Sequence, residues 1–384
     1  AWTHVARGHS AGDVHASLAH GGCGTLWKGD GDEMRRINIG AAAILLPLLI
    51  LLSSRELHAQ ERYWEILTLF GGDDSGTFPF ALLHDAKRDR IIIAGRTEES
   101  DLPVTPDAMK REFTDWMEGF IAVFNADCSE LVYCSYIGGS RNEAIVDAIL
   151  LDEDRILIAL GTYSSDLLTT GTILSESLPG EGNTWLAVLS LDSFDILDAG
   201  YFGGRGNDGV KRLLQLDNGD IVITGAGSSS DLPVTPNAFQ PRKRSSGDGW
   251  DAFIAIFDST FNLTYCSYHG GPTGSEDAFK ALAETENYIV FSGTVDGHGM
   301  PVTENAYQKT FAGGYFDAYL VAVSKDSLKR VYSTYLGGND RDNFHEIIAL
   351  DDDRIVLVGS SRSLDFPVTS NALSLIHISE PTRP

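Results

Sequence analysis

A pair of glycines recurs along the chain at a nearly constant interval, and this repeat constrains the fold more than any other feature. Each pair follows an aromatic-rich segment, and the intervals are 65 to 67 residues. The first glycines of the pairs are Gly71, Gly138, Gly203, Gly270 and Gly337. A second column repeats at similar intervals and holds Gly95, Leu160, Gly225, Gly293 and Gly359. Such a fixed period is typical of architectures in which each repeat is one structural unit stacked on the next.

Each repeat contains four segments with the composition of β-strands. In the last full repeat they cover residues 279–283, 288–293, 317–323 and 330–336. The second segment is almost continuously apolar, as in Ile289-Val290-Phe291, which predicts a strand buried on both faces. No helical period of useful length is present, so we expect an all-β chain. Four antiparallel strands in each repeat of about 66 residues predict a β-propeller of four-stranded blades.

Three segments give this prediction a more specific form. Residues 332–338, 229–239 and 251–255 resemble the seven-bladed β-propeller repeat family of bacterial secreted proteins. The resemblance extends over residues 60–372 and implies a propeller fold and an extracellular or cell-surface location. It implies no particular reaction, because the family has none in common. The second repeat departs most from the pattern, since Leu160 replaces the glycine of the second column.

The first methionine, Met34, starts a segment with the pattern of a secretory signal peptide. Two arginines follow it directly, and an apolar run continues from residue 37 to residue 52. This run is too short for a membrane-spanning helix, which needs roughly 20 apolar residues. We therefore expect a signal peptide over residues 34–59 and no membrane span in the mature protein. Residues 1–33 are then interpreted as non-native translation upstream of the start.

The C-terminal end also has a foreign pattern. Residues 373–383 resemble the translation of a sequencing adapter, so residues 373–384 are excluded from the expected fold. The propeller is then expected over residues 60–372. It begins with a single fourth strand at residues 64–70, continues with four full repeats, and ends with the first two strands of a fifth. The sequence therefore predicts an incomplete propeller of four full blades plus partial ones.

The charge of the chain is strongly acidic and is confined to the repeats. The 384 residues include 29 Lys and Arg against 54 Asp and Glu, a net charge of −25. The two ends are balanced, so the excess lies in residues 60–372, as 23 basic against 48 acidic side chains. Such a surface repels polyanions, which excludes nucleic acid as the expected partner. Hydrophobic residues make up 43% of the chain, which excludes a disordered protein.

The loops after the second strand of most repeats share a Pro-Val-Thr motif and are about 20 residues long. In an antiparallel blade these loops emerge at the same face as the Gly-Gly turns, and such insertions often form the binding face. Asp107, Asn237 and Asn305 follow the motif and are ligand-face candidates. In the alternative, their side chains cap a turn while neighbouring apolar side chains pack as spacers. These spacers would be Met109, Phe239 and Tyr307.

An acidic residue recurs five or six residues after the first glycine of most pairs. The members of this acidic column are Glu143, Asp208, Glu276 and Asp342. They are ligand-face candidates and weak calcium candidates, because calcium binds carboxylate and carbonyl oxygens. No Asp-x-Asp-x-Asp-Gly loop is present to hold calcium locally, and no other cofactor is expected. In the alternative, these carboxylates accept backbone N–H bonds within the turn.

Three cysteines lie within the expected propeller. Cys134 and Cys266 occupy equivalent positions in two fourth strands, and Cys128 precedes Cys134 across an expected hairpin. A Cys128–Cys134 disulfide is one interpretation if the compartment is oxidising. Three free, half-buried thiols are the other.

The catalytic signatures of the common hydrolases and nucleotide-binding enzymes are absent from the sequence. It contains no Gly-x-Ser-x-Gly, no His-Glu-x-x-His and no Gly-x-x-x-x-Gly-Lys-Ser/Thr. We therefore expect a secreted or cell-surface propeller, with the periplasm as the other location. It would act as a non-catalytic binding, adhesion or structural module toward an extracellular protein or polysaccharide. The alternative is an extracellular glycan-active enzyme, a lyase or hydrolase, that uses acidic residues on the loop-rich face.

Overall fold

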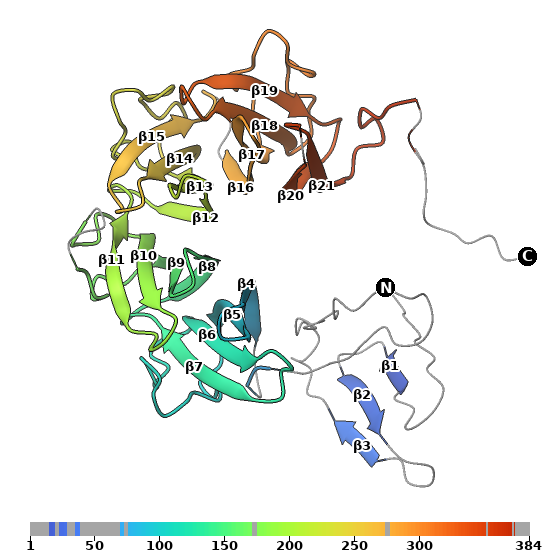
Figure 1. Ribbon diagram of the computed structural model, residues 1–384. Coiled ribbons are helices and arrows are strands. Elements are labelled where there is room, and N and C mark those ends of the chain that lie inside the picture. The colour runs from blue at the N-terminus through green and yellow to red at the C-terminus, as the bar shows by residue number, and fades with distance from the viewer. Residues whose placement is uncertain are drawn as a thin grey trace, which may run out of the picture. The chain divides into compact units, whose positions relative to one another are not determined.

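The computed structural model describes most of the chain from Phe70 onward. The described residues are 70–72, 76–170, 175–272, 277–350, 352–370 and 372, together with the backbone of three strands nearer the N-terminus. All of the elements among them are β-strands (Figure 1). Within this part of the chain there is no helix of the length and apolarity needed to cross a membrane. The chain divides into two compact units, residues 1–167 with 188–197, and residues 168–187 with 198–384.

The three N-terminal strands form a small antiparallel sheet. They are β1 (His15–Ala19), β2 (Cys23–Lys28) and β3 (Arg35–Asn38), paired in that order. Strand β3 covers the first residues of the expected signal peptide, and residues 39–59 lie outside the described residues. Most of the expected single fourth strand, residues 64–69, and the adapter-like residues 373–384 also lie outside them.

The first large sheet belongs to the first unit and contains four antiparallel strands in chain order. They are β4 (Thr77–Asp85), β5 (Arg90–Thr97), β6 (Glu118–Asn125) and β7 (Leu131–Ile137). The apolar run of β5 is buried, as expected for a central strand with neighbours on both faces. Ile93, Phe120 and Tyr136 form part of its core.

The second large sheet has the same strand order. Its strands are β8 (Glu143–Leu150), β9 (Arg155–Thr162), β10 (Asn183–Ser190) and β11 (Ile196–Phe202). Strands β8 and β9 belong to the first unit, where β8 packs on β4 and β5. The boundary between the two units falls within β10 and β11.

The second unit contains two complete four-stranded sheets and a two-stranded sheet. The first complete sheet has β12 (Asp208–Gln215), β13 (Ile221–Gly227), β14 (Asp251–Phe257) and β15 (Leu263–His269). The second has β16 (Ala278–Glu284), β17 (Tyr288–Val295), β18 (Asp317–Ser324) and β19 (Arg330–Leu336). The last sheet has β20 (Asp342–Ala349) and β21 (Ile355–Ser361). The four strands predicted for the last full repeat coincide with β16 to β19.

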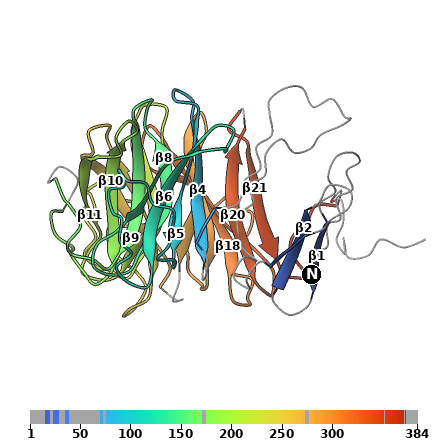
Figure 2. The ribbon, with the colours of Figure 1, turned by 90° about the horizontal axis from the view of Figure 1, so that it is seen from below.

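Successive sheets of the second unit pack face to face through their first strands. Strand β16 contacts β12, β13 and β14, and β20 contacts β16, β17 and β18. In Figure 2, β20 and β21 lie beside β18, in agreement with these contacts. The side chains between the sheets are apolar, and they include Val222, Ile254, Phe279 and Phe291 in one cluster. Repeated four-stranded antiparallel sheets packed in this way give an all-β, β-propeller-like fold, as predicted.

A backbone irregularity in the first strand of each sheet explains the second glycine column. The pairing of the first strand with the second shifts register in every large sheet, for example between Val210 and Arg212. At this bulge the backbone of the first strand approaches the glycine of the second. A Cβ on Gly225 would lie 2.1 Å from the Gly209 carbonyl oxygen, and one on Gly293 would lie 1.8 Å from that of Ala278. At Gly225 and Gly293, glycine is therefore required by close approach of the backbone, whereas the second sheet has the same shift and holds Leu160.

Candidate functional site

Three described members of the acidic column are buried and bind the backbone of the Gly-Gly turns. The Gly139 N–H donates to Glu143 Oε2 at 3.1 Å in the first unit. In the second unit, the Gly204 N–H donates to Asp208 Oδ2 at 2.6 Å and the Gly338 N–H to Asp342 Oδ2 at 2.7 Å. The three acids are at most 2% exposed. These contacts are the backbone hydrogen bonds expected if the acidic column stabilises the turns and does not bind a ligand.

The fourth member of the column, Glu276, lies outside the described residues. The next residue, Asp277, is buried and occupies the capping position instead. Its Oδ2 accepts from the Gly271 N–H at 2.9 Å. Burial raises the pKa of Asp277 to about 8, and the nearby Asp251 and Asp296 charges add to this effect. The acidic column is therefore shifted by one residue at this turn.

The segment after the second strand also contacts the Gly-Gly turns, through hydrogen bonds to the capping carboxylates. A serine hydroxyl donates to the capping carboxylate, from Ser164 to Glu143 at 2.6 Å and from Ser363 to Asp342 at 2.7 Å. Two residues after each serine, an exposed aspartate accepts from the backbone that follows the glycines. These aspartates are Asp166, Asp231 and Asp365. The Gly-Gly turns and the start of the long loops thus share one end of each sheet, as the sequence predicted.

A second polar side chain, from the start of the third strand, flanks the first glycine of the four turns that follow the complete sheets. A Cβ on Gly138 would lie 2.3 Å from Glu118 Oε2 and 2.5 Å from Glu143 Oε2. A Cβ on Gly337 would lie 2.5 Å from Asp317 Oδ1 and 2.9 Å from Asp342 Oδ2. These distances leave no room for a side chain. At Gly138 and Gly337, two buried acids therefore enclose the first glycine and would have to move to admit a side chain.

Sequence reasoning missed these flanking residues, although a signal was available. Each stands two positions before the aromatic residue that begins the core of the third strand. They are Glu118, Asn183, Asp251 and Asp317, before Phe120, Trp185, Phe253 and Tyr319. They differ in type, so they do not form an obvious column in one sequence.

Burial shifts the titration of the acids around the turns. It raises the pKa of Glu143 to about 7, against the hydrogen bonds from Ser164 and Thr162. It also raises the pKa of Asp317 to about 7, and the Asp342 charge acts in the same direction. The pKa of Asp208 is raised by burial as well. Removal of a carboxylate from water disfavours its charged form unless donors replace the lost hydration.

The long loops are fastened along the outer edge of the fourth strand. In the first unit the Thr105 N–H donates to the Cys134 carbonyl at 3.0 Å, and the Tyr136 N–H donates to the Lys110 carbonyl at 3.1 Å. Equivalent pairs join Thr235 to Cys266, Tyr268 to Gln240, Thr303 to Ser333 and Tyr335 to Gln308. The loop therefore covers an edge that would otherwise expose unpaired backbone groups.

Tyrosines of the fourth strand hold the same loops by their hydroxyl groups. The Tyr136 hydroxyl accepts from the Leu102 N–H at 3.1 Å and donates to the Glu99 carbonyl at 2.9 Å. The Tyr268 hydroxyl makes the same two bonds, to Leu232 and Ser229. This explains the recurrent Tyr-x-x-Tyr segment before the glycine pair, and it gives the loops a structural role.

The three loop candidates, Asp107, Asn237 and Asn305, are exposed. Their turns are closed by the backbone, for example by the Ala108 N–H donating to the Thr105 carbonyl at 3.1 Å. The expected side-chain cap is not among the hydrogen bonds of the described residues. The expected spacer role fits Phe239, which packs on the core, and is wrong for two others. Those two, Met109 and Tyr307, are 39% and 65% exposed.

The three cysteines are free and buried. Cys134 lies inside β7 opposite Ala122, while Cys128 lies in the β6–β7 turn with a positive φ of 52°. Cys128 and Cys134 are therefore free thiols in this structure, and both are packed into the core of the first sheet. Burial raises the pKa of Cys134 and of Cys266 to about 12, which keeps both thiols protonated and unreactive.

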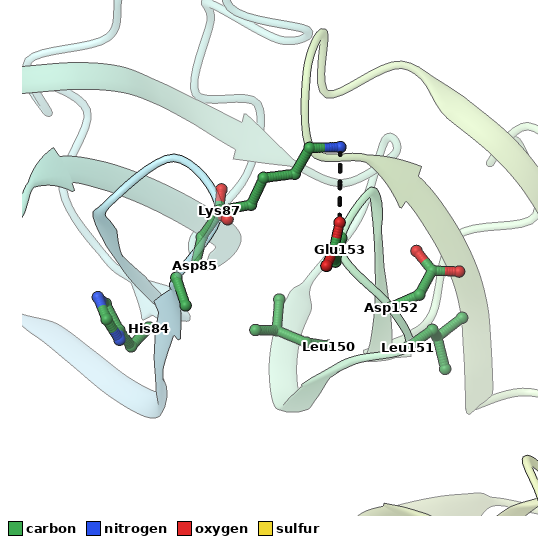
Figure 3. A pocket seen from close by; sticks show the side chains of 8 residues that line it. His84, Asp85, Lys87, Leu150, Leu151, Asp152 and Glu153 are labelled. Carbon is green, nitrogen blue, oxygen red and sulfur yellow. Dashed lines mark ion pairs between the residues drawn. The ribbon is translucent and has the colours of Figure 1, made fainter.

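A pocket of about 520 Å³ lies at the opposite end of the first unit, between the β4–β5 and β8–β9 turns. Figure 3 shows Lys87 reaching toward Glu153, while His84 and Asp152 lie at other positions of the lining. Lys87 Nζ is 2.6 Å from Asp154 Oδ1 and 4.0 Å from Glu153 Oε2. The lining therefore combines an imidazole, an ammonium and carboxylates on exposed turns, and sequence reasoning did not predict it.

Arg88 supports the turns beside this pocket. Its guanidinium lies 3.3 Å from Asp85 Oδ2, 2.8 Å from Asp154 Oδ1 and 2.7 Å from Asp192 Oδ1. The Arg88 side chain is 10% exposed and that of Asp85 is 3% exposed. One arginine thus joins three turns of the first unit, so this ion pair network is structural.

The second unit has a pocket at the same end of its sheets, with a different lining. Its volume is about 410 Å³, and its charged lining residues are Asp217, Glu284, Glu286 and Asp352. It contains neither histidine nor lysine among its lining residues. Among the described residues, no group of three or more His, Cys, Asp or Glu side chains is arranged to hold a metal ion. Calcium binding therefore stays a prediction.

Comparison with known proteins adds little to this geometry. No protein-family model and no curated protein sequence matches the chain. Among solved structures, the chain is similar to the acylaminoacyl peptidase of Pyrococcus horikoshii at 10% identity and a TM-score of 0.30. The match covers 73% of this chain and spans 43% of that peptidase. A likeness of this degree carries no argument about function.

Proposed function

We propose that this chain is a non-catalytic binding, adhesion or structural module of a secreted or cell-surface protein. The observation that carries the proposal is the burial of the acidic column in the Gly-Gly turns. The residues that an enzyme would need on the loop-rich face are bound to the backbone of their own turns, as for Glu143, Asp208 and Asp342. The long loops of that face are bound to the fourth strands.

The repeated sheets support a more specific form of this proposal. The chain would be an incomplete propeller of the seven-bladed repeat family, with a signal peptide at residues 34–59. Four repeats with the same strand pattern and a fifth with two described strands agree with that proposal. The acidic surface agrees with an extracellular protein or polysaccharide as partner and disfavours nucleic acid.

Binding is proposed at the turns between the first and second strands. These turns carry exposed charged side chains that differ from sheet to sheet, and the pocket with Lys87 and the pocket with Glu286 lie there. Variation between repeats on a common scaffold is how repeat proteins create a specific surface.

The pocket of the first unit also favours the second candidate function, a glycan-active enzyme. Its lining brings together unlike, non-repeating side chains, including His84, Lys87 and Asp152. General acid–base chemistry needs such a combination. Lys87, however, is paired with Asp154, and the lining contains no Ser, Thr or Cys side chain.

One experiment separates the two candidates. The full chain is tested for binding to and for turnover of a panel of bacterial extracellular polysaccharides, together with an Asp152→Asn, Lys87→Ala variant. Binding without turnover, weakened in the variant, is the expected result. Catalytic turnover that the variant abolishes would contradict the proposal. The matched control is Asp220→Ala, a turn residue outside both pocket linings.

A further inference from the structure

Three Gly-Gly junctions, each lying within one unit, place two polar side chains around the first glycine. One comes from the start of a third strand and the other from the start of the next first strand. The pairs are Glu118–Glu143 in the first unit, and Asn183–Asp208 and Asp317–Asp342 in the second. All six side chains are at most 2% exposed. Two of these junctions hold two carboxyl groups, and the third holds an amide and a carboxyl group.

The amide junction shows which hydrogen bonds the site requires. With its nitrogen oriented toward Asp208, the Asn183 amide donates to Asp208 Oδ2 at 3.1 Å. Its oxygen then accepts from the Gly180 N–H at 3.1 Å. The side chain at this position therefore accepts from the loop through one atom and donates to the capping carboxylate through the other.

At the Asp317–Asp342 junction, Asp317 accepts a backbone hydrogen bond as Asn183 does, but it has no N–H group to donate to the capping carboxylate. Asp317 Oδ2 accepts from the Ala312 N–H at 2.7 Å, as Asn183 accepts from Gly180. Asp317 Oδ1 is buried without a hydrogen-bond partner, and so is Asp342 Oδ1. Asp317 Oδ1 and Asp342 Oδ2 flank the same position at Gly337. The atom equivalent to the Asn183 nitrogen is thus a carboxyl oxygen beside a second carboxyl group.

The Glu118–Glu143 junction repeats this arrangement in the first unit. Glu118 Oε1 accepts from the Thr114 N–H at 3.0 Å and from Lys110 Nζ at 2.6 Å. Glu118 Oε2 is buried without a partner and lies beside Gly138, close to Glu143 Oε2. Lys110 neutralises one of the two carboxylates, and the second still has no cation beside it.

We propose that each carboxyl pair holds one proton between its two members. At the Asp317 pair, the carboxyl O–H of Asp317 then donates to Asp342 in the place of the Asn183 amide N–H. At the Glu118 pair, Lys110 pairs with Glu118, and Glu143 holds the proton. When the proton leaves to solvent, two adjacent anions remain in a buried site, and their repulsion weakens the junction between successive sheets. The two carboxyl junctions are therefore pH-sensitive, and the amide junction, which holds a single carboxyl group, is their counterpart without a carboxyl pair.

The surrounding charges are consistent with a held proton. At the Asp317–Asp342 pair, the neutral Gln308 contacts Asp317 and the anionic Asp365 lies nearby. At the Glu118–Glu143 pair, Lys110 is the adjacent cation. At Asp208, Asp231 is the nearby anion, and Arg205 pairs with that residue at 3.5 Å. The Asp317 pair has no cationic contact in the described residues, so it is the more sensitive of the two.

The direction of the pH effect follows from the folded-state titration. Burial, with the charge of the partner, raises the pKa of Asp317 to about 7 from an ordinary value near 4. The folded chain then binds more protons than the unfolded chain between these two values. The contribution of the Asp317–Asp342 pair to stability is therefore fully present below about pH 4 and is lost as the pH rises through about 7.

The test converts the carboxyl junction of the second unit into an amide junction, and the amide junction into a carboxyl junction. The unfolding midpoints of the wild type, Asp317→Asn and Asn183→Asp are measured at pH 5, 6, 7 and 8 and compared at each pH. Asp317→Asn is expected to match the wild type at pH 5 and to exceed it by about 3 °C or more at pH 8. Asn183→Asp is expected to match the wild type at pH 5 and to fall below it by a similar amount at pH 8.

Two results would overturn the proposal. One is an Asn183→Asp midpoint whose difference from the wild type does not change with pH. The other is a rise of the wild-type midpoint with millimolar CaCl2 at pH 8 that Asp317→Asn abolishes, because a cation rather than a proton would then neutralise the pair. A decrease in the infrared band of protonated carboxylic acids at pH 6 on Asp317→Asn substitution would independently support a held proton. None of these readouts depends on the proposed ligand binding.

Discussion

The two ends of the sheets use acidic residues in opposite ways. At the Gly-Gly end the capping acids are buried and make the same hydrogen bonds in different sheets, as Asp208 and Asp342 do. At the other end, the turns between the first and second strands carry exposed acids whose partners differ from sheet to sheet. Repetition along the chain therefore indicates a structural role, and departure from the repeat indicates where a specific surface is available. The acidic charge of the chain serves both purposes.

The largest expected effect is the loss of a capping carboxylate at the Gly-Gly end. Asp208→Ala removes the acceptor of the Gly204 N–H and of the Ser229 hydroxyl, and leaves the buried donors unpaired. We expect the free energy of unfolding to fall by about 2–4 kcal/mol. Chemical denaturation measures this change.

Asp217→Ala is the matched control for that variant, because Asp217 lies at the other end of the same first strand and is exposed. It is expected to change the free energy of unfolding by less than about 0.5 kcal/mol. Equal effects of the two substitutions would contradict the distinction between the two ends.

The strands and the repeat could be predicted from the sequence because their signals are local. An apolar run such as Ile289-Val290-Phe291 specifies a central strand, and β17 includes it. The glycine columns could also be recognised in the sequence, but the reason why glycine occupies these positions could not. Gly337 is enclosed by Asp317 and Asp342, which come from different sheets, so the cause appears only when the sheets are packed.

The candidate site was predicted less well, for a related reason. The ligand-face role of Asp107 and Asn237 stays a prediction, because both side chains are exposed while backbone bonds fasten their loops to a fourth strand. The pocket near Lys87 was missed because it forms between turns that are far apart in the sequence. The signal available was the basic Lys87-Arg88 pair, which the equivalent turns of the other repeats lack.

A smaller effect is expected at the Arg88 ion pair network, which lies at the end of the first unit opposite the Gly-Gly turns. Arg88→Met leaves the buried Asp85 without its guanidinium partner. The free energy of unfolding is expected to fall by about 2 kcal/mol, and Lys87→Met, at an exposed pair, by less than about 1 kcal/mol. Thermal unfolding of both variants at low and high salt makes the comparison. A Lys87→Met effect as large as that of Arg88→Met would show that burial does not decide the contribution of these pairs.

The smallest effect concerns the fastening of a long loop. Tyr268→Phe removes the hydroxyl that bonds to Leu232 and Ser229, which should lower the free energy of unfolding by about 1–2 kcal/mol. It should also make the loop between β13 and β14 more sensitive to proteolysis. The control is Tyr332→Phe, whose hydroxyl makes one hydrogen bond, to the exposed Tyr307. Unchanged proteolysis in Tyr268→Phe would show that the backbone bonds alone hold the loop.

Hydrogen exchange of individual peptides tests the central claim most directly, since the claim is that the acids of the Gly-Gly end bind the chain's own backbone. The amides of Gly139, Gly204 and Gly338 are predicted to exchange slowly, because each donates to a buried carboxylate. The amides of exposed turn residues such as Asn218 are predicted to exchange rapidly. Rapid exchange of the Gly-Gly amides, equal to that of the turns at the other end, would contradict the account.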